Sequence, residues 1–475
     1  MLNHSIRQCC LVSLLLLTSC TSMRLEDFFA SYVQQMQPVK NALLQGQFEQ
    51  AKSLVPKQNI SHNAYSLSLL EQGKIAFLQG NWQESEQLFS KVYQELEKEK
   101  LKAKVQISAG LKNTGAIISN DSAISYAIPH YEQSMLHSYQ ALNYLYQGKV
   151  ESALVEIRRA NLVQVNALKE NENDIIKAQD EMASFGINAR SIDSAYPPMT
   201  ELIGEVKNGF QNAFTFYLSG VLYEVAGELN DAYIDYKKAL EIFPDNPYLQ
   251  KDILRLAYLL NMSDDLIKYQ QQFSFQDKTQ DTASSNTGQL VVLYEQNLVN
   301  AKQEATVNLP VFTRHDDIRF FNFSLPVYRF SGHMNQPLYL RNNQQMYTSA
   351  KIVQLQSLAS KQLEEQLPSL VTRQALRLVA KEQMRRKMSK EGGDLGNILA
   401  SLYNIASEHA DTRSWLALPN QIDMMKIDLP EGQHSLALEH INGATHTDVT
   451  ITKGRITLLH VTTLGRHTHL NTIDL

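Results

Sequence analysis

The residues best suited to chemistry in this 475-residue chain are histidines, because six of the thirteen lie between His434 and His469. Neutral imidazoles are ligands for zinc and copper. His467 and His469 are two positions apart in a predicted strand and would therefore share one of its faces. No acidic residue or cysteine stands beside them. They are the candidate metal ligands, and surface histidines on a polar strand are the alternative.

Known catalytic motifs are absent from the sequence. It contains no H-E-x-x-H zinc motif, no G-x-S-x-G nucleophile turn and no P-loop. The glycine-rich stretch 392–396 lacks the preceding strand that a dinucleotide-binding loop requires. An envelope glycan hydrolase or transferase would need two carboxylates that converge in a cleft, and no pair can be assigned to one. We therefore expect a protein without enzymatic activity or cofactor, with the glycan enzyme as the alternative.

A basic segment, 369–390, stands out on a chain with a formal net charge of −5. Arg373, Arg377, Lys381 and Arg385 recur every four residues and would share one helix face. Such a face suits an anionic lipid, a lipopolysaccharide phosphate or an acidic protein partner. The alternative is a solvated face whose long side-chain stems cover the core. The four cations are candidate partner-binding residues.

An export signal is indicated at the N-terminus, where all three cysteines of the chain lie within twenty residues. Arg7 precedes the short apolar run 11–17, and small residues precede Cys20. The run is shorter than the roughly 20 apolar residues that span a membrane. The tetrapeptide 17–20, Leu-Thr-Ser-Cys, resembles the lipobox of bacterial lipoproteins. An ordinary signal peptide is the alternative.

The lipobox resemblance implies removal of residues 1–19 and acylation of the Cys20 thiol. Two or more acyl chains anchor a protein stably, since each buried CH₂ contributes about 0.8 kcal/mol. Thr21 stands where an aspartate would favour the inner membrane, so we expect the periplasmic face of the outer membrane. The mature chain would then hold no disulfide. Its acidic balance excludes a typical nucleic-acid-binding protein.

Residues 20–270 are predicted to form a helical array, because apolar residues recur at three and four and Pro and Gly are sparse. The segment 213–247 resembles a tetratricopeptide repeat. Gly220 is placed where two helices touch, Gly227 ends the first helix, and Ala232 begins the inner stripe of the second. Weaker units recur, with turns at Gly46, Gly80 and Gly148. We predict an irregular tetratricopeptide-like array, with a generic helical bundle as the alternative.

A Ser/Thr-rich linker is predicted at 271–288, followed by a smaller mixed α/β domain at 289–475. Strands are expected at 290–294 and 320–328, and helices between 351 and 410. Lys453-Gly454 predicts a β-hairpin near the end of the chain, within a β-sandwich-like portion. The fold class is therefore α+β.

A short polar and aromatic run joins the last predicted helices to the final strands. In it, we expect Arg413 and Asp411 to form an ion pair and Trp415 to fill the junction between helix and β-module. Tryptophan and arginine also dominate protein-binding hot spots, which is the alternative role.

Three stretches, 139–161, 217–233 and 410–419, together resemble a family of proteobacterial tetratricopeptide-containing envelope lipoproteins. The resemblance implies a location and a repeat fold and carries over no catalytic residue. We expect a periplasmic scaffold that binds an envelope protein in peptidoglycan synthesis or polymer export. Asn143, Arg158 and Arg159 are its candidate partner-binding residues. A metal-binding periplasmic module is a further alternative, and no nucleic acid is expected as a partner.

Overall fold

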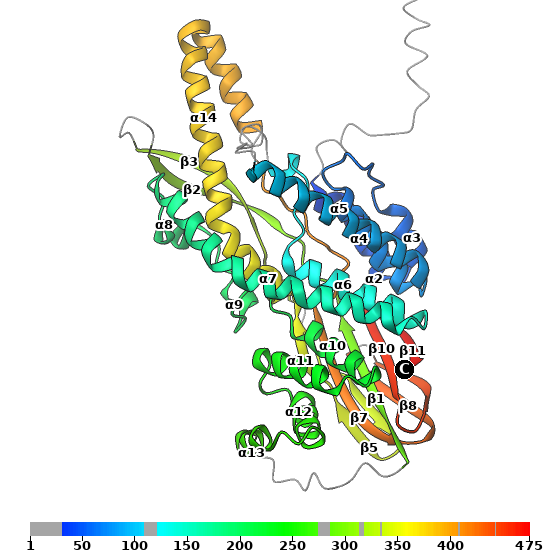
Figure 1. The fold of residues 1–475 in the computed structure, drawn as a ribbon. Coiled ribbons are helices and arrows are strands. Elements are labelled where there is room, and N and C mark those ends of the chain that lie inside the picture. The colour runs from blue at the N-terminus through cyan, green and yellow to red at the C-terminus, as the bar shows by residue number, and fades with distance from the viewer. Residues whose placement is uncertain are drawn as a thin grey trace, which may run out of the picture.

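The structure is a computed structural model that describes residues 31–108, 121–273, 286–312, 318–332, 335–406, 409–441 and 443–475. It combines a helical array with a mixed α/β domain, which confirms the α+β fold class (Figure 1). Cys20 and the predicted signal lie outside the described residues. Helix α13 ends at Gln272 and strand β1 begins at Thr287, while most of the predicted linker also lies outside them.

The array consists of consecutive antiparallel helix pairs with one inserted pair of short helices. Its helices are α2 (Tyr32–Leu44), α3 (Phe48–Leu54), α4 (Tyr65–Leu78), α5 (Trp82–Ser108), α6 (His130–Tyr146), α7 (Val150–Ala183), α8 (Ala189–Ala195), α9 (Thr200–Ile203), α10 (Ala213–Val225), α11 (Leu229–Ile242), α12 (Pro247–Leu259) and α13 (Ser263–Gln272). Gly46, Gly80, Gly148 and Gly227 each join a pair at φ between 68° and 76°, which favours glycine. The predicted irregular repeat array is therefore present.

Close helix contact in the α10–α11 pair depends on Gly220. A Cβ atom there would lie 2.4 Å from Cε1 of Tyr236. The Tyr236 ring is fully buried, and its hydroxyl donates a 2.6 Å hydrogen bond to Glu224, which limits its movement. The sequence therefore placed this contact correctly.

Gly220→Ala is expected to destabilise the protein, although alanine is the better helix former by about 1 kcal/mol. Overpacking against the fixed Tyr236 ring costs about 1–3 kcal/mol and should prevail. Urea unfolding followed by circular dichroism measures the difference. An alanine variant as stable as the wild type would show that the two helices separate without cost.

The mixed domain is built on three sheets and one long helix. Its elements are β1 (Thr287–Gln296), β2 (Gln303–Phe312), β3 (Ile318–Val327), β4 (Tyr339–Asn342), β5 (Gln345–Thr348), β6 (Ala350–Gln354), α14 (Leu355–Ala406), β7 (Gln421–Pro430), β8 (Gly432–His440), β9 (Gly443–Ile451), β10 (Ile456–Leu464) and β11 (His467–Asp474). The strand orders are β11-β10-β1-β7-β6, β5-β4-β8-β9 and β2-β3. The β2–β3 ribbon and α14 extend to one side of the molecule, where α8 lies beside β2 (Figure 1).

The five-stranded sheet is the middle of three layers. On β1, Leu290 and Val292 pack against the four-stranded sheet, while Val291 and Leu293 belong to the core shared with the helices. Both faces of β1 are therefore covered, which explains its nearly continuous apolar sequence. The two sheets form the sandwich that we predicted.

The predicted hairpin at Lys453-Gly454 is wrong. β9 pairs with β8 in the four-stranded sheet, whereas β10 pairs with β1 and β11 in the five-stranded sheet. The turn is therefore a corner at which the chain passes from one layer of the sandwich to the other. Gly454 has φ of 69°, a conformation that a hairpin and a sandwich corner share. Within the described residues, no helix is both long and apolar enough to cross a membrane.

Candidate protein-binding cleft of the helical array

The inner face of the array is already occupied by the five-stranded sheet. Lys74 of α4 forms a 2.7 Å ion pair with Glu295 of β1, and the Tyr139 hydroxyl of α6 donates to the same carboxylate at 2.8 Å. All three side chains are buried. Further along the array, Lys426 of β7 pairs with Glu224 of α10 and with Asp252 of α12. Side chains that would otherwise face a groove therefore bind the protein's own sheet.

The segment between α14 and β7 also occupies the inner face of the array. Two buried carboxylates of the array accept its backbone N–H groups: Glu71 from Leu416 at 2.7 Å and Ala417 at 2.9 Å, and Glu132 from Trp415 at 3.0 Å. The Trp415 ring packs edge-on against Phe89 and Tyr139. The array thus holds an extended stretch of its own chain through main-chain contacts.

Glu71 combines full burial with several hydrogen-bond donors. Burial raises its pKa to about 8, although the Leu416 and Ala417 N–H groups and the Tyr32 hydroxyl favour the carboxylate. Burial likewise raises the pKa of Glu132. Shifted carboxylates often mark catalytic sites. Here both are buried beneath Trp415 and its neighbours and bind the backbone, so the geometry assigns them a structural role.

The raised pKa of Glu71 predicts that stability falls as pH rises from about 5 to about 8. In this window the folded protein binds a proton at Glu71 that the unfolded chain has lost, so unfolding becomes easier as pH increases. The effect should be on the order of 3 kcal/mol between pH 5.5 and 8. Urea unfolding of wild type and Glu71→Gln at both pH values isolates it. Equal pH dependence in the two proteins would assign the effect to other groups.

A small polar cleft lies on the other side of α6, between α5 and α7. It has a volume of about 50 Å³. Its lining combines aromatic, amide and charged side chains, contributed by Phe89, Ser90, Tyr93, Leu136, His137, Gln140, Tyr144, Glu156 and Arg159. α6 supplies the floor of the cleft, and the long helices α5 and α7 supply its walls.

The charges in the cleft centre on Glu156, which is buried. Its two carboxylate oxygens contact His137 Nδ1 at 2.7 Å and an Arg159 guanidinium nitrogen at 2.6 Å. The same guanidinium lies over the Tyr93 ring, 4.4 Å from its centroid. Arg159 is therefore held in one orientation while its side chain remains 39% exposed. An arginine fixed against a tyrosine is suited to bind a carboxylate or peptide group of another protein.

The structure separates the three residues that we expected to bind a partner from the array. Arg159 lines the cleft. Asn143 is fully buried and donates to Ser85 Oγ at 2.9 Å, so it joins α6 to α5 and offers no exposed surface. Arg158 is 52% exposed, but it faces α10 and α11, where it pairs with Glu228 at 3.3 Å. The three residues therefore do not form one surface.

The cations of α14 are placed differently from the exposed basic face that we considered. Arg377 is buried and forms two hydrogen bonds with Asp121, at 2.9 and 3.2 Å. Arg373 is partly exposed and pairs with the same aspartate at 3.3 Å, and Lys381 is buried. Arg373 and Arg377 therefore join α14 to the array. Arg385 lies outside the residues whose side chains the structure describes.

Comparison with known proteins gives only distant similarity. No family model matches the chain, and no curated protein matches it. The crystal structure of MamA is similar at 14% identity over 50% of this chain and 90% of MamA, with a TM-score of 0.27. The TPR2AB-domain–pHSP90 complex of yeast Sti1 is similar at 9% identity over 50% and 87%, with a TM-score of 0.19. At these values the likeness says nothing about function, and the repeat character rests on the helix pairs described above.

The candidate metal ligands lie on β11 next to the first helix pair. The His469 ring packs on Phe48 with centroids 4.4 Å apart, and His467 lies beside Gly46. Among the residues that the structure describes, no group of three or more His, Cys, Asp and Glu side chains is arranged to hold a metal ion. The two histidines thus contribute to packing between the sheet and the array.

Sequence reasoning missed the buried carboxylates Glu71, Glu132 and Glu295. Glu71 follows Leu69 and Leu70, and Glu295 follows the apolar run 290–294, which was the available signal at these two positions. Glu132 is followed by Gln133 and Ser134 and carried no such signal. A charged residue within such a run points to a buried partner. The sequence does not reveal the partner itself.

Proposed function

We propose that the protein is a non-enzymatic lipoprotein, anchored through Cys20 to the periplasmic face of the outer membrane, that binds an envelope protein through its helical array. The proposed binding role rests on the small polar cleft between α5 and α7. There Arg159 is fixed and accessible, whereas the inner face of the array is filled by the sheet. Support for the anchor is the lipobox-like tetrapeptide 17–20. The assembly served is peptidoglycan synthesis or polymer export.

The chemistry of the cleft favours an acidic segment of the partner. A guanidinium group carries five N–H donors, so Arg159 can keep its bond to Glu156 and bind a second carboxylate. Tyr93 and Tyr144 add aromatic surface at the cleft, which suits a peptide side chain. A glycan enzyme gains no support here, because Glu71 and Glu132 are buried and bound to backbone N–H groups.

Replacement of Cys20 by serine is expected to release the protein from the outer membrane, because the hydroxyl is not the thiol that receives the lipid. Membrane fractionation with immunodetection measures the effect. More than about 90% of the wild type should sediment with the membrane, since two acyl chains anchor stably. A serine variant that sediments equally would exclude lipid anchoring through this residue.

Arg159→Gln is expected to weaken partner capture, while Arg158→Gln is a matched control. Both residues are exposed arginines of α7 with one acidic partner each, but only Arg159 lines the cleft. A photo-crosslinking amino acid in place of Ser90, at the cleft, would report the bound protein in cells. We expect capture to fall about fivefold or more with Arg159→Gln and to be unchanged with Arg158→Gln. Equal capture in both variants would exclude the cleft.

A further inference from the structure

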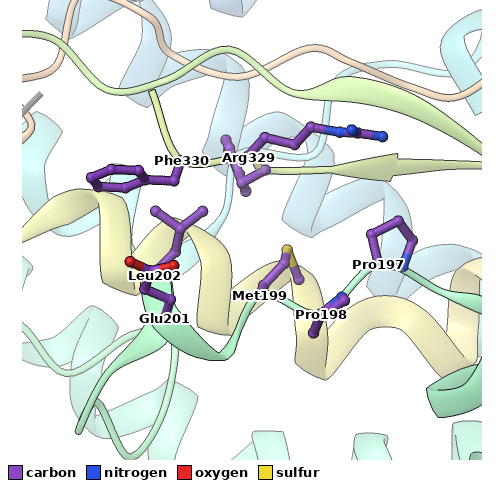
Figure 2. Close-up of a pocket in the computed structure, with 8 residues that line it drawn as sticks. Pro197, Pro198, Met199, Glu201, Leu202, Arg329 and Phe330 are labelled. Atoms are coloured by element: carbon purple, nitrogen blue, oxygen red, sulfur yellow. The ribbon is translucent and has the colours of Figure 1, made fainter. Parts of the chain in front are cut away.

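A second cavity lies at the base of the extended β2–β3 and α14 region. Its volume is about 150 Å³. One wall is the turn from Pro197 to Met199 with the following Leu202, and the other is the segment 328–330 that follows β3. Figure 2 shows these two walls facing each other, with Phe330 and Arg329 opposite Leu202 and Met199. The cavity therefore lies between the α8–α9 insertion of the array and the mixed domain.

Hydrogen bonds hold both walls in place. Ser357 Oγ of α14 donates to the Leu202 carbonyl at 2.6 Å, and the Tyr196 hydroxyl donates to the Pro326 carbonyl. On the opposite wall, Asn300 donates to the Arg329 carbonyl at 3.1 Å. Two consecutive prolines further restrict the backbone of the first wall. The cavity is consequently preformed, which lowers the entropy cost of filling it.

The size and lining of the cavity fit one aromatic ring. An apolar cavity of about 150 Å³ binds benzene in another protein, so this volume suits a single ring. Proline rings, the Met199 thioether and the buried Tyr328 ring are favourable contacts for an aromatic group. Phe330 is 55% exposed and extends the apolar surface beyond the cavity.

The rim identifies the kind of molecule that carries the ring. Arg329 and Glu201 are exposed and place one charge of each sign at the opening. A peptide offers both carbonyl acceptors and N–H donors next to each side chain, which this rim complements. We propose that the cavity binds an aromatic side chain, presented by a partner protein, with Phe330 as the residue that extends the contact. This site is separate from the Arg159 cleft and stands whether or not that cleft binds a partner.

The test uses N-acetyl-phenylalanine amide as the probe and the full-length protein labelled with ¹³C at the methionine methyl groups. The Met199 signal, assigned with a Met199→Leu variant, should shift saturably with a Kd of about 1 mM, the range expected for a fragment of this size. Phe330→Ala should weaken binding about tenfold. Phe320→Ala is the matched control, because Phe320 is 70% exposed on β3 and does not line the cavity.

Saturable binding that Phe330→Ala weakens and Phe320→Ala leaves unchanged supports the site. An unsaturable shift, or equal binding by both variants, overturns it. N-acetyl-leucine amide that binds as tightly as the phenylalanine probe overturns the aromatic specificity. The readout is a signal at Met199, so failure here leaves the capture experiment at the Arg159 cleft unaffected, and the reverse also holds.

Discussion

Glu295→Leu is expected to destabilise the protein by about 3–5 kcal/mol, because it leaves the Lys74 ammonium buried without its counter-charge. Lys74 and Glu295 are each about 1% exposed and lie 2.7 Å apart. The substitution also removes the acceptor of the Tyr139 hydroxyl and the partner of His460, whose Nε2 is 3.1 Å away. Three side chains at the contact between array and sheet would therefore lose their shared partner together.

A double variant separates the contribution of the ion pair to stability from the contribution of burying the two side chains. Lys74→Met with Glu295→Leu places two apolar side chains of similar size in the same space, and such replacements are often nearly neutral. We expect the double variant to regain the part of the loss that comes from the unpaired Lys74 ammonium, so the two substitutions should couple. The Tyr139 hydroxyl and His460 still lack Glu295 in the double variant, so their share of the loss should remain. Denaturant unfolding of wild type, both single variants and the double variant gives the coupling free energy.

Glu439→Leu provides the control for charge loss on an exposed strand. Glu439 of β8 pairs with Arg341 at 2.8 Å, but the two side chains are 41% and 53% exposed. Exposed pairs contribute about 0–1 kcal/mol, so this change should have little effect. Similar losses in Glu295→Leu and Glu439→Leu would mean that the buried pair does not hold the array against the sheet.

The sequence predicted the elements that depend on local patterns. The helix pairs follow from the spacing of apolar residues and from glycines such as Gly220 and Gly227, whose roles the structure confirms. At 411–415, the predicted ion pair and the burial of Trp415 are correct, but the ring packs against α5 and α6 of the array and not at a junction of α14 with the β-module. Arg413 pairs with Asp411 at 2.7 Å, and Trp415 is fully buried. The Gly220 contact and the Arg413–Asp411 pair each join residues close together in the chain, whereas the Trp415 ring packs against distant residues of the array.

The interactions that the sequence did not predict join distant parts of the chain. Lys74 and Glu295 are 221 residues apart, and Arg377 and Asp121 are 256 apart. The four-residue spacing of the α14 cations indicates a common helix face, yet it does not say whether that face meets solvent or an aspartate of the array. The sequence also did not predict that the inner face of the array is filled. Helices that bind their own sheet need the same kinds of surface residue as helices that bind a partner protein.

Trp415→Ala is the second change with a large expected effect, about 3–5 kcal/mol of lost stability. The indole ring is fully buried, with its centroid 5.7 Å from that of Phe89 and 6.0 Å from that of Tyr139. Its removal opens a cavity between α5, α6 and the segment that Glu71 and Glu132 hold. That segment should then become accessible to protease.

The chain has a second tryptophan that serves as a matched control. Trp82 stacks on Tyr146 with centroids 4.1 Å apart, but it is only partly buried, so Trp82→Ala should cost less. Urea unfolding gives both free energies, and limited proteolysis followed by mass spectrometry locates the cut. In a Trp82→Phe background, the fluorescence of Trp415 should resist iodide quenching in the folded protein.

These measurements also decide between the two roles that the sequence left open for Trp415. A binding hot spot must be accessible to its partner, so its ring would be quenched by iodide and its loss would reduce capture without unfolding the protein. A structural role predicts the opposite: protection of the ring from iodide, a large loss of stability in Trp415→Ala, and proteolytic cleavage between α14 and β7. The buried ring and the backbone N–H group that donates to Glu132 support the structural role, since both contact the interior of the array.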